Sequence, residues 1–211
     1  MKKQYVQYGC GEIAPDGWIN FDASPTLRLQ KIPVFGNLIK PKLNTVFPEN
    51  VKYGDIIKGL PVKDNSCDGL FCSHTLEHLS LNDFRKALIN SYKILKPGGL
   101  FRIVMPDLES YAKLYLQELN SGNSNAGFVF FEHSRLGIVE RPRGLKAMAT
   151  ALYGNAHHLW LWDFPSLNKE LENAGFKNIR RCDFDDSTDK MFQLVEIVWR
   201  FKDAVAVECT R

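Results

Sequence analysis

A chain of 211 residues, 45% of them hydrophobic, is long enough for one sizeable domain and too short for two, so we expect a single domain over residues 1–211. The net charge of +3 is mild and the basic residues are scattered, which argues against a nucleic-acid-binding protein. Five cysteines without a C-x-x-C pair suggest neither a disulfide framework nor a zinc ribbon, and no apolar run approaches membrane-spanning length. We therefore expect a cytoplasmic protein without membrane insertion, of an oligomeric state that the sequence does not predict.

Strand-forming runs alternate with turn residues in the first part of the chain. Residues 4–8, QYVQY, predict a short strand that stops at the turn GCG, and residues 18–22, WINFD, predict a second strand. Only ten residues separate Gly11 from Asp22. The helix that usually connects two such strands must therefore be short or absent.

Helical and strand patterns alternate along the rest of the chain. Residues 23–50 contain four prolines and predict irregular structure. Apolar residues at helical spacing predict a helix from Leu81 to the KPGG break, with Ser80 and Asp83 as a capping box. Further strands are expected at residues 51–55, 67–73, 100–105, 176–184 and 192–201, and a further helix at 165–175. This order predicts an α/β fold with a mostly parallel sheet, and the two closing strands allow an antiparallel edge.

Residues 74–78, His-Thr-Leu-Glu-His, match the H-x-x-E-H pattern of one class of zinc peptidases. In that pattern both histidines face the metal from one helix, whereas His74 and His78 here precede the cap at Ser80. A single helical turn with a distant third ligand would still allow a zinc-dependent hydrolase, and simple packing of the loop is a second alternative. We favour a ligand-binding loop at the carboxyl end of a parallel strand, and we expect no metal.

Four stretches, taken in this order, resemble the class I S-adenosylmethionine-dependent methyltransferases, specifically the small bacterial type 11-like enzymes. They are VQYGCG, GWINFD, GDI and CDGLFCSHTLEHL…KILKPGGLFRIVMPD, and the resemblance covers residues 4–106 and 163–200. It implies a Rossmann-like sheet of the seven-stranded type, S-adenosylmethionine as methyl donor and S-adenosylhomocysteine as product. The glycine loop lacks G-x-G-x-x-G, which argues against a dehydrogenase.

The resemblance also implies which residues bind the cofactor. Gly9 and Gly11 let the backbone pass close to it, with Tyr8 and Cys10 in the same loop. Asp22 resembles the acid that accepts hydrogen bonds from the ribose hydroxyls, although an aspartate after a strand can also simply cap a turn.

Further cofactor contacts are implied after the third and fourth strands. Asp55 resembles the acid that binds the adenine amino group, and Ile56 would cover the ring, although a Gly-Asp pair can also serve only to form a turn. Ser73, His74 and His78 lie where the family's fourth strand opens under the sulfonium. They are expected at the methionine end of the cofactor.

The stretch 108–162 is far longer than an ordinary connection, and we expect it to be an insertion that covers the substrate as a lid. It combines aromatic with basic and histidine side chains: Phe128, Phe130, Phe131, Trp160, Trp162, His133, Arg135, Arg141, Arg143 and Lys146. This composition suits a small polar acceptor, anionic or glycosyl, so we expect O-methylation with His158 or His157 as general base. Three alternatives remain: the aromatics only pack onto the sheet, the histidines are structural, or the protein binds the cofactor without catalysis.

Overall fold

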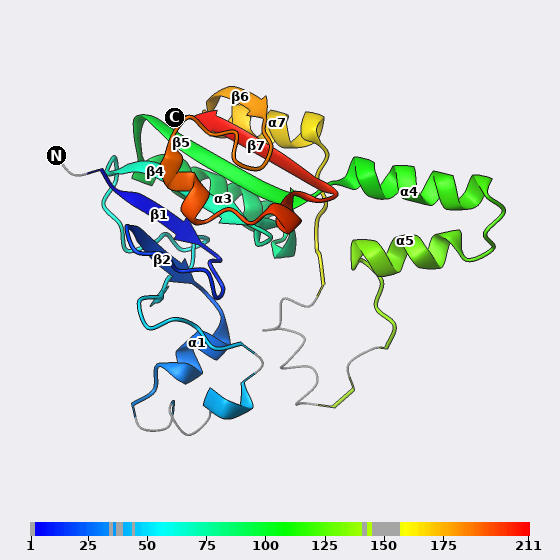
Figure 1. Ribbon diagram of the computed structural model, residues 1–211, viewed down its shortest axis with the longest axis horizontal. Coiled ribbons are helices and arrows are strands. Elements are labelled where there is room, and N and C mark those ends of the chain that lie inside the picture. Colours follow the sequence, from blue (N-terminus) through cyan, green and yellow to red (C-terminus); the bar gives the residue numbers. More distant parts are fainter. Residues whose placement is uncertain (1–2, 34–35, 37–39, 44, 141–142, 145–156) are drawn as a thin grey trace.

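The computed structural model describes residues 3–33, 36, 40–43, 45–140, 143–144 and 157–211. Seven strands form one sheet in the order β3-β2-β1-β4-β5-β7-β6 (Figure 1). The strands are β1 (Tyr5–Tyr8), β2 (Trp18–Asp22), β3 (Lys52–Tyr53), β4 (Cys67–Ser73), β5 (Leu95–Pro106), β6 (Lys177–Arg181) and β7 (Ala204–Thr210). Strands β1 to β5 pair in parallel, and β7 runs antiparallel to both β5 and β6. The predicted mostly parallel sheet with antiparallel pairing at one edge is confirmed.

The helices lie largely between the strands that the sequence patterns separate. They are α1 (Pro25–Gln30), α3 (Leu81–Ile94), α4 (Leu108–Asn120), α5 (Ala126–Ser134) and α7 (Phe164–Ala174). Helix α3 begins as predicted, because the Ser80 Oγ accepts a hydrogen bond from the Asp83 amide at 3.3 Å. Its apolar face buries Phe84 and Leu88 against the sheet. No helix in the described part of the chain is long and apolar enough to cross a membrane.

The connection between β1 and β2 contains no helix. Residues 9–17 pass directly from one strand to its parallel neighbour, and the Cys10 amide donates to the Phe21 carbonyl at 3.2 Å within this turn. The prediction of a short or absent first helix is confirmed. Parallel neighbours normally need a longer, helical crossover, so the sheet face beside β1 must be covered by another element.

The prediction of a closing strand at residues 192–201 is wrong. This segment forms two short 3₁₀ helices, η3 (Lys190–Leu194) and η4 (Val198–Phe201), and the last strand is β7, which follows it. Phe192, Val195 and Glu196 are buried, a spacing of three and four residues that suits a turn and does not suit the alternation of a strand. Strand β7 fills the position in the sheet instead, because its side chains are buried on both faces.

The η3–η4 segment covers the sheet face that lacks a crossover helix. Phe192 packs edge-on against Trp18 of β2 at 5.5 Å between ring centroids, and it also contacts Phe71 of β4. The Trp18 indole donates to the Met191 carbonyl at 3.1 Å. Aromatic side chains from the end of the chain thus take the place of the missing helix on this face.

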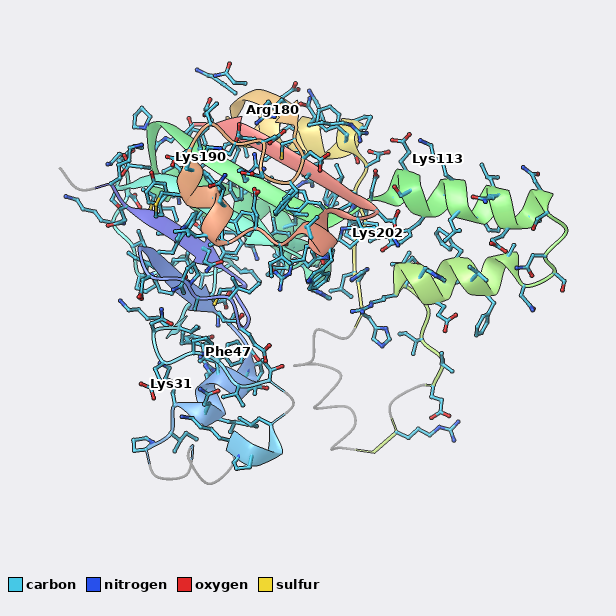
Figure 2. All side chains as sticks on the ribbon, in the orientation of Figure 1. Lys31, Phe47, Lys113, Arg180, Lys190 and Lys202 are labelled. Carbon is cyan, nitrogen blue, oxygen red and sulfur yellow. The ribbon has the colours of Figure 1, made fainter. Side chains whose placement is uncertain are left out.

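Helices α4 and α5 form a hairpin that projects away from the sheet (Figure 1). Tyr115 of α4 and Phe130 of α5 pack against each other at 6.0 Å, whereas Phe128 and Phe131 are more than half exposed. Figure 2 shows side chains crowded around the sheet and others extending into solvent from both hairpin helices. Of the predicted insertion, residues 141–142 and 145–156, and with them Arg141 and Lys146, lie outside the described residues.

Candidate cofactor site

The carboxyl ends of β1, β2 and β4 border a cavity of about 520 Å³. Its walls come from the loops after consecutive strands and include Gly11, Asp22, Asp55, Ser73, His74 and His78. Open parallel sheets bind ligands at this edge, and the volume lies in the range of small-molecule sites. Most of the cofactor-binding residues predicted from the sequence are therefore brought together in one place.

The two glycines of the first loop have different structural roles. Both have a positive φ, 64° for Gly9 and 57° for Gly11, which a side chain would strain. A Cβ on Gly9 would lie 1.9 Å from the Thr75 Oγ1, so this glycine allows the loops after β1 and β4 to pack together. A Cβ on Gly11 would have no described atom within 4 Å, so Gly11 leaves space beside the cavity.

Asp22 closes the loop and also faces the cavity. Its Oδ2 accepts from the Gly11 amide at 3.0 Å, and its Oδ1 accepts from the Ser24 amide at 2.8 Å. Asp22 therefore does cap the turn, as the alternative interpretation predicted. Each carboxylate oxygen has a second lone pair, so a ligand hydroxyl can bind without displacing either amide.

Asp55, which follows β3, likewise forms a local turn and lines the cavity. Its Oδ1 accepts from the Ile57 amide at 3.0 Å, which forms a local turn, and its Oδ2 lies 3.5 Å from the Lys58 ammonium. The adjacent Ile56 is 5% exposed and packs into the main hydrophobic core while lining the cavity.

Two of the predicted contacts point elsewhere. The Tyr8 side chain is buried in the core, with its hydroxyl 3.1 Å from the Ser91 Oγ, although the residue borders the cavity. Cys10 lies in a small apolar cluster with Leu27 and Phe47, and it is not among the described residues that line the cavity. Burial raises the pKa of its thiol to about 12. Its position in the glycine loop implied a contact that its side chain does not make.

The loop after β4 carries unsatisfied and strained groups. The Ser73 Oγ is buried and has no hydrogen-bond partner among the described residues. His74 has a φ of 50°, an uncommon conformation for a residue other than glycine. Strain and an unpaired hydroxyl at the wall of a cavity are typical of a ligand-binding position.

Glu77 stands at the centre of a histidine cluster beside the cavity. It lies on η2 (Leu76–His78), its side chain is fully buried, and neither carboxylate oxygen has a hydrogen-bond partner in the described part of the chain. Its Oε1 lies 3.5 Å from the His74 Nδ1, 3.8 Å from the His78 Nε2 and 4.0 Å from the His158 Nε2. His158, from the predicted lid segment 108–162, thus lies beside Glu77 of the HTLEH motif.

Backbone hydrogen bonds fix this meeting of two distant segments. The Glu77 carbonyl accepts from the Leu159 and Trp160 amides at 2.7 and 3.1 Å. Just beyond, Trp162 stacks on Phe84 of α3 at 4.4 Å and is 3% exposed, so this aromatic residue packs onto the fold.

The two candidate bases differ in their surroundings. The His157 ring is exposed, and its backbone carbonyl lies 2.9 Å from the His78 Nδ1. His158 is 7% exposed, and burial lowers the pKa of its imidazole, although the Glu77 carboxylate opposes this. His158 is therefore the candidate that the protein holds in a defined, neutral state near pH 7.

Two arginines in the cavity wall have no counterpart in the sequence prediction. Arg28 of α1 lies 4.0 Å above the Tyr53 ring, and both residues line the cavity. Arg200 of η4 also lines the cavity, its Nε is buried without a partner among the described residues, and burial lowers its pKa. Because Arg200 lies in the segment predicted as a strand, no local pattern indicated this placement.

Comparisons with known proteins agree with this arrangement. Residues 36–103 match the family model of a methyltransferase domain. Over 48 residues the chain is 44% identical to ltbC of Aspergillus luteorubrus, described as a probable methyltransferase, and the match covers 22% of this chain but only 17% of that protein.

Two solved structures have a similar fold at low sequence identity. One is an S-adenosylmethionine-dependent methyltransferase of Thermotoga maritima, described as a possible histamine N-methyltransferase, with 18% identity, a TM-score of 0.51 and coverage of 100% of this chain and 83% of that chain. The other is a chain from the Haloferax volcanii complex of the Trm112 methyltransferase activator with a candidate methyltransferase, with 14% identity, a TM-score of 0.50 and coverage of 99% and 82%.

The fold and the matched segment agree with the predicted resemblance to the class I S-adenosylmethionine-dependent methyltransferases. The residues present fit that cofactor. The open space beside Gly11, the free lone pairs of Asp22 and the unpaired Ser73 hydroxyl all face or border one cavity. Arg200 adds a positive charge where a carboxylate could be held.

Proposed function

We propose that this protein transfers the methyl group of S-adenosylmethionine to an oxygen of a small polar acceptor. The observation that carries the proposal is the cavity at the carboxyl ends of the parallel strands, with Asp22 and Asp55 on one side and the Glu77–histidine cluster on the other. The sulfonium of the bound cofactor supplies an activated methyl group. The protein's own task is then to align the acceptor and to accept a proton.

Each residue has a role in this proposal. Asp22 holds the ribose hydroxyls, Asp55 and Ile56 hold the adenine, and Arg200 binds the carboxylate of the methionine end. His158 is placed as the general base, since its imidazole faces the Glu77 carboxylate, which stabilises the imidazolium formed on proton transfer. His157 is the weaker candidate because its ring is exposed to solvent.

We further propose that residues 108–162 cover the acceptor. The support is that this segment begins at the end of β5 and returns past the cluster, where His158 lies against Glu77. The arginines of the segment suit an anionic or glycosyl acceptor.

Binding of S-adenosylhomocysteine, measured by titration calorimetry, tests the cofactor site. Asp22→Ala should weaken binding by about 1–3 kcal/mol, because two hydrogen bonds to a charged acceptor are lost. Asp16→Ala is the matched control, since Asp16 is exposed between β1 and β2 and is absent from the described cavity wall. Equal affinity of Asp22→Ala and the unmodified protein would contradict the proposed placement.

A panel of sugar, nucleotide, phenolic and carboxylic acceptors tests methyl transfer. We expect turnover with at least one hydroxyl-bearing acceptor, and a large loss of kcat in His158→Ala with cofactor binding retained. Full turnover in both His157→Ala and His158→Ala would contradict the base assignment. Cofactor binding without turnover of any acceptor would instead favour a non-catalytic binding protein.

A further inference from the structure

We infer that Glu77, His78 and His158 form a binding site for a divalent first-row transition metal at the wall of the cavity. One ligand atom from each of the three residues lies within 4.8 Å of the others. The site joins the HTLEH turn to a segment about eighty residues further along the chain. It differs from the helical zinc motif considered above. That motif would use His74 and His78 as its histidine ligands, whereas this site uses His78 and His158.

The carboxylate is the first argument for a bound cation. The Glu77 side chain is completely buried, yet none of the described residues donates a hydrogen bond to either of its oxygens. A buried charge without a partner is costly, and buried carboxylates in proteins are paired or coordinate metals. No lysine or arginine of the described residues forms an ion pair with Glu77.

The imidazole orientations are the second argument. The Nδ1 atoms of His78 and His158 lie 2.9 and 2.8 Å from the carbonyl oxygens of His157 and Ser134. A carbonyl can only accept, so each Nδ1 carries a proton, and in the neutral form of each ring the Nε2 lone pair is directed toward Glu77. Such a backbone partner on the second nitrogen is the usual support of a metal-binding histidine.

His74 repeats this arrangement at the edge of the cluster. Its Nε2 lies 2.8 Å from the Arg200 carbonyl, and its Nδ1 faces the Glu77 Oε1 at 3.5 Å. Acceptor atoms thus converge from several directions on the same carboxylate, with no described donor between them. A cation bound by Glu77, His78 and His158 would satisfy the Glu77 carboxylate and the Nε2 lone pairs of both histidines at once.

The donor set indicates the kind of metal. Imidazole nitrogens with one carboxylate suit zinc, cobalt, manganese or iron, whereas magnesium and calcium prefer oxygen ligands. Zinc bound at 2.0–2.1 Å would bring ligand atoms to about 3.3 Å from one another. The 3.8 and 4.0 Å from Glu77 to the two imidazoles therefore require shifts of about half an ångström, and the imidazole nitrogens, which lie within 4.8 Å of each other, must also move closer together. Side-chain rotation can supply shifts of this size.

The position suggests what the metal would do. Three protein ligands leave a coordination position open, as in catalytic zinc sites, and His78 belongs to both the cluster and the cavity wall. There the metal would bind the acceptor hydroxyl and lower its pKa. With the His158 Nε2 bound to the metal, His157 would take the role of base and accept the hydroxyl proton; the oxygen–methyl bond would form, and the sulfur–methyl bond would break to leave a thioether. This role rests on the proposed function, whereas the site itself does not.

Zinc titration of the untagged, chelator-treated protein tests the site without cofactor or acceptor. We expect one equivalent to bind with a submicromolar Kd, and cobalt to give visible d–d absorption without a thiolate charge-transfer band. His78→Ala and His158→Ala should each weaken zinc binding at least 100-fold, and Glu77→Gln at least 10-fold. The cobalt spectrum of the unmodified protein remains informative if a variant fails to fold.

His133→Ala is the matched control, because His133 is exposed on α5 and hydrogen-bonds within its own helix. Its zinc affinity should equal that of the unmodified protein. Absence of stoichiometric binding at tenfold excess zinc, or equal affinity in His78→Ala and His158→Ala, would overturn the inference. Zinc binding in a protein that transfers no methyl group would support the site and count only against the proposed function.

Discussion

Two regions of this molecule bury carboxylates and treat them in opposite ways. Near the β6 edge, Arg102 is fully buried and donates to Glu196 at 2.6 Å and to Glu208 at 2.9 Å. The remaining oxygens are also bonded, since Glu196 accepts from the Asp185 amide. Beside the cavity, Glu77 is equally buried, but it faces imidazoles and has no donor among the described residues.

The difference separates a structural network from a cluster that we propose to be functional. A guanidinium with five donors can satisfy several carboxylates permanently, so the Arg102 network is complete in the folded chain. Among the described residues, no lysine or arginine forms an ion pair with Glu77. The folded protein therefore leaves the Glu77 carboxylate available to a bound ligand.

The largest effect is expected when the complete network is broken. Arg102→Met should lower the free energy of unfolding by about 3–5 kcal/mol, because Glu196 stays buried without its cation and Glu208 loses one of its two. Urea unfolding followed by circular dichroism measures this. Arg180→Ala is the control: Arg180 is 41% exposed and also pairs with Glu208, so its loss should cost less than about 1 kcal/mol. Equal losses in the two variants would show that the network is not held by Arg102.

A smaller effect of opposite sign is expected in the incomplete cluster. In the presence of a chelator, Glu77→Gln should raise the free energy of unfolding by about 1–2 kcal/mol, because the amide removes a buried charge and donates to the imidazole lone pairs. The same urea experiment applies. With saturating zinc, the unmodified protein should be more stable than Glu77→Gln. If Glu77→Gln is clearly less stable than the unmodified protein in the presence of the chelator, protonated histidines already balance the Glu77 carboxylate.

The smallest effect concerns acid. Burial raises the pKa of Asp186, but hydrogen bonds from Arg180 and Arg102 outweigh this and lower it to about 2. A lowered pKa contributes stability that is complete above the ordinary value of 3.8 and lost as the pH falls to about 2. Asp186→Asn should therefore be less stable by under about 1 kcal/mol at pH 7, with the difference vanishing near pH 2. Thermal unfolding across this range measures it, and a pH-independent difference would contradict the assignment.

Local patterns predicted most of the fold. Helix α3 followed from its apolar spacing and the Ser80 cap, and β4 from a run of buried residues bounded by turns. Residues 192–201 misled the prediction because their apolar side chains pack against Trp18 and Phe71, which are distant in sequence. Strand β7 was missed because its run, AVAVECT, lies beyond the stretch taken as the final strand.

The residues of the site also fall into those that local sequence patterns could predict and those that they could not. The positions of Gly11, Asp22 and Asp55 beside the cavity could be predicted because each lies at or shortly after the end of a recognisable strand. The partnership of Glu77 with His158 could not, since tertiary structure alone brings the two together. The motif H-x-x-E-H was visible, but the helical geometry assumed for it concealed the role of the more distant histidine.

The covering of the sheet by the η3–η4 segment has a consequence for folding. Tyr5 donates to Asp189 at 2.6 Å across 184 residues, and Trp18 donates to Met191 across 173. Strand β7, the last strand of the described sheet along the chain, pairs between β5 and β6. Such long-range closure is slow and leaves apolar surface exposed in intermediates. During synthesis on the ribosome, the aromatic face formed by Tyr5 and Trp18 therefore stays uncovered until the η3–η4 segment has emerged.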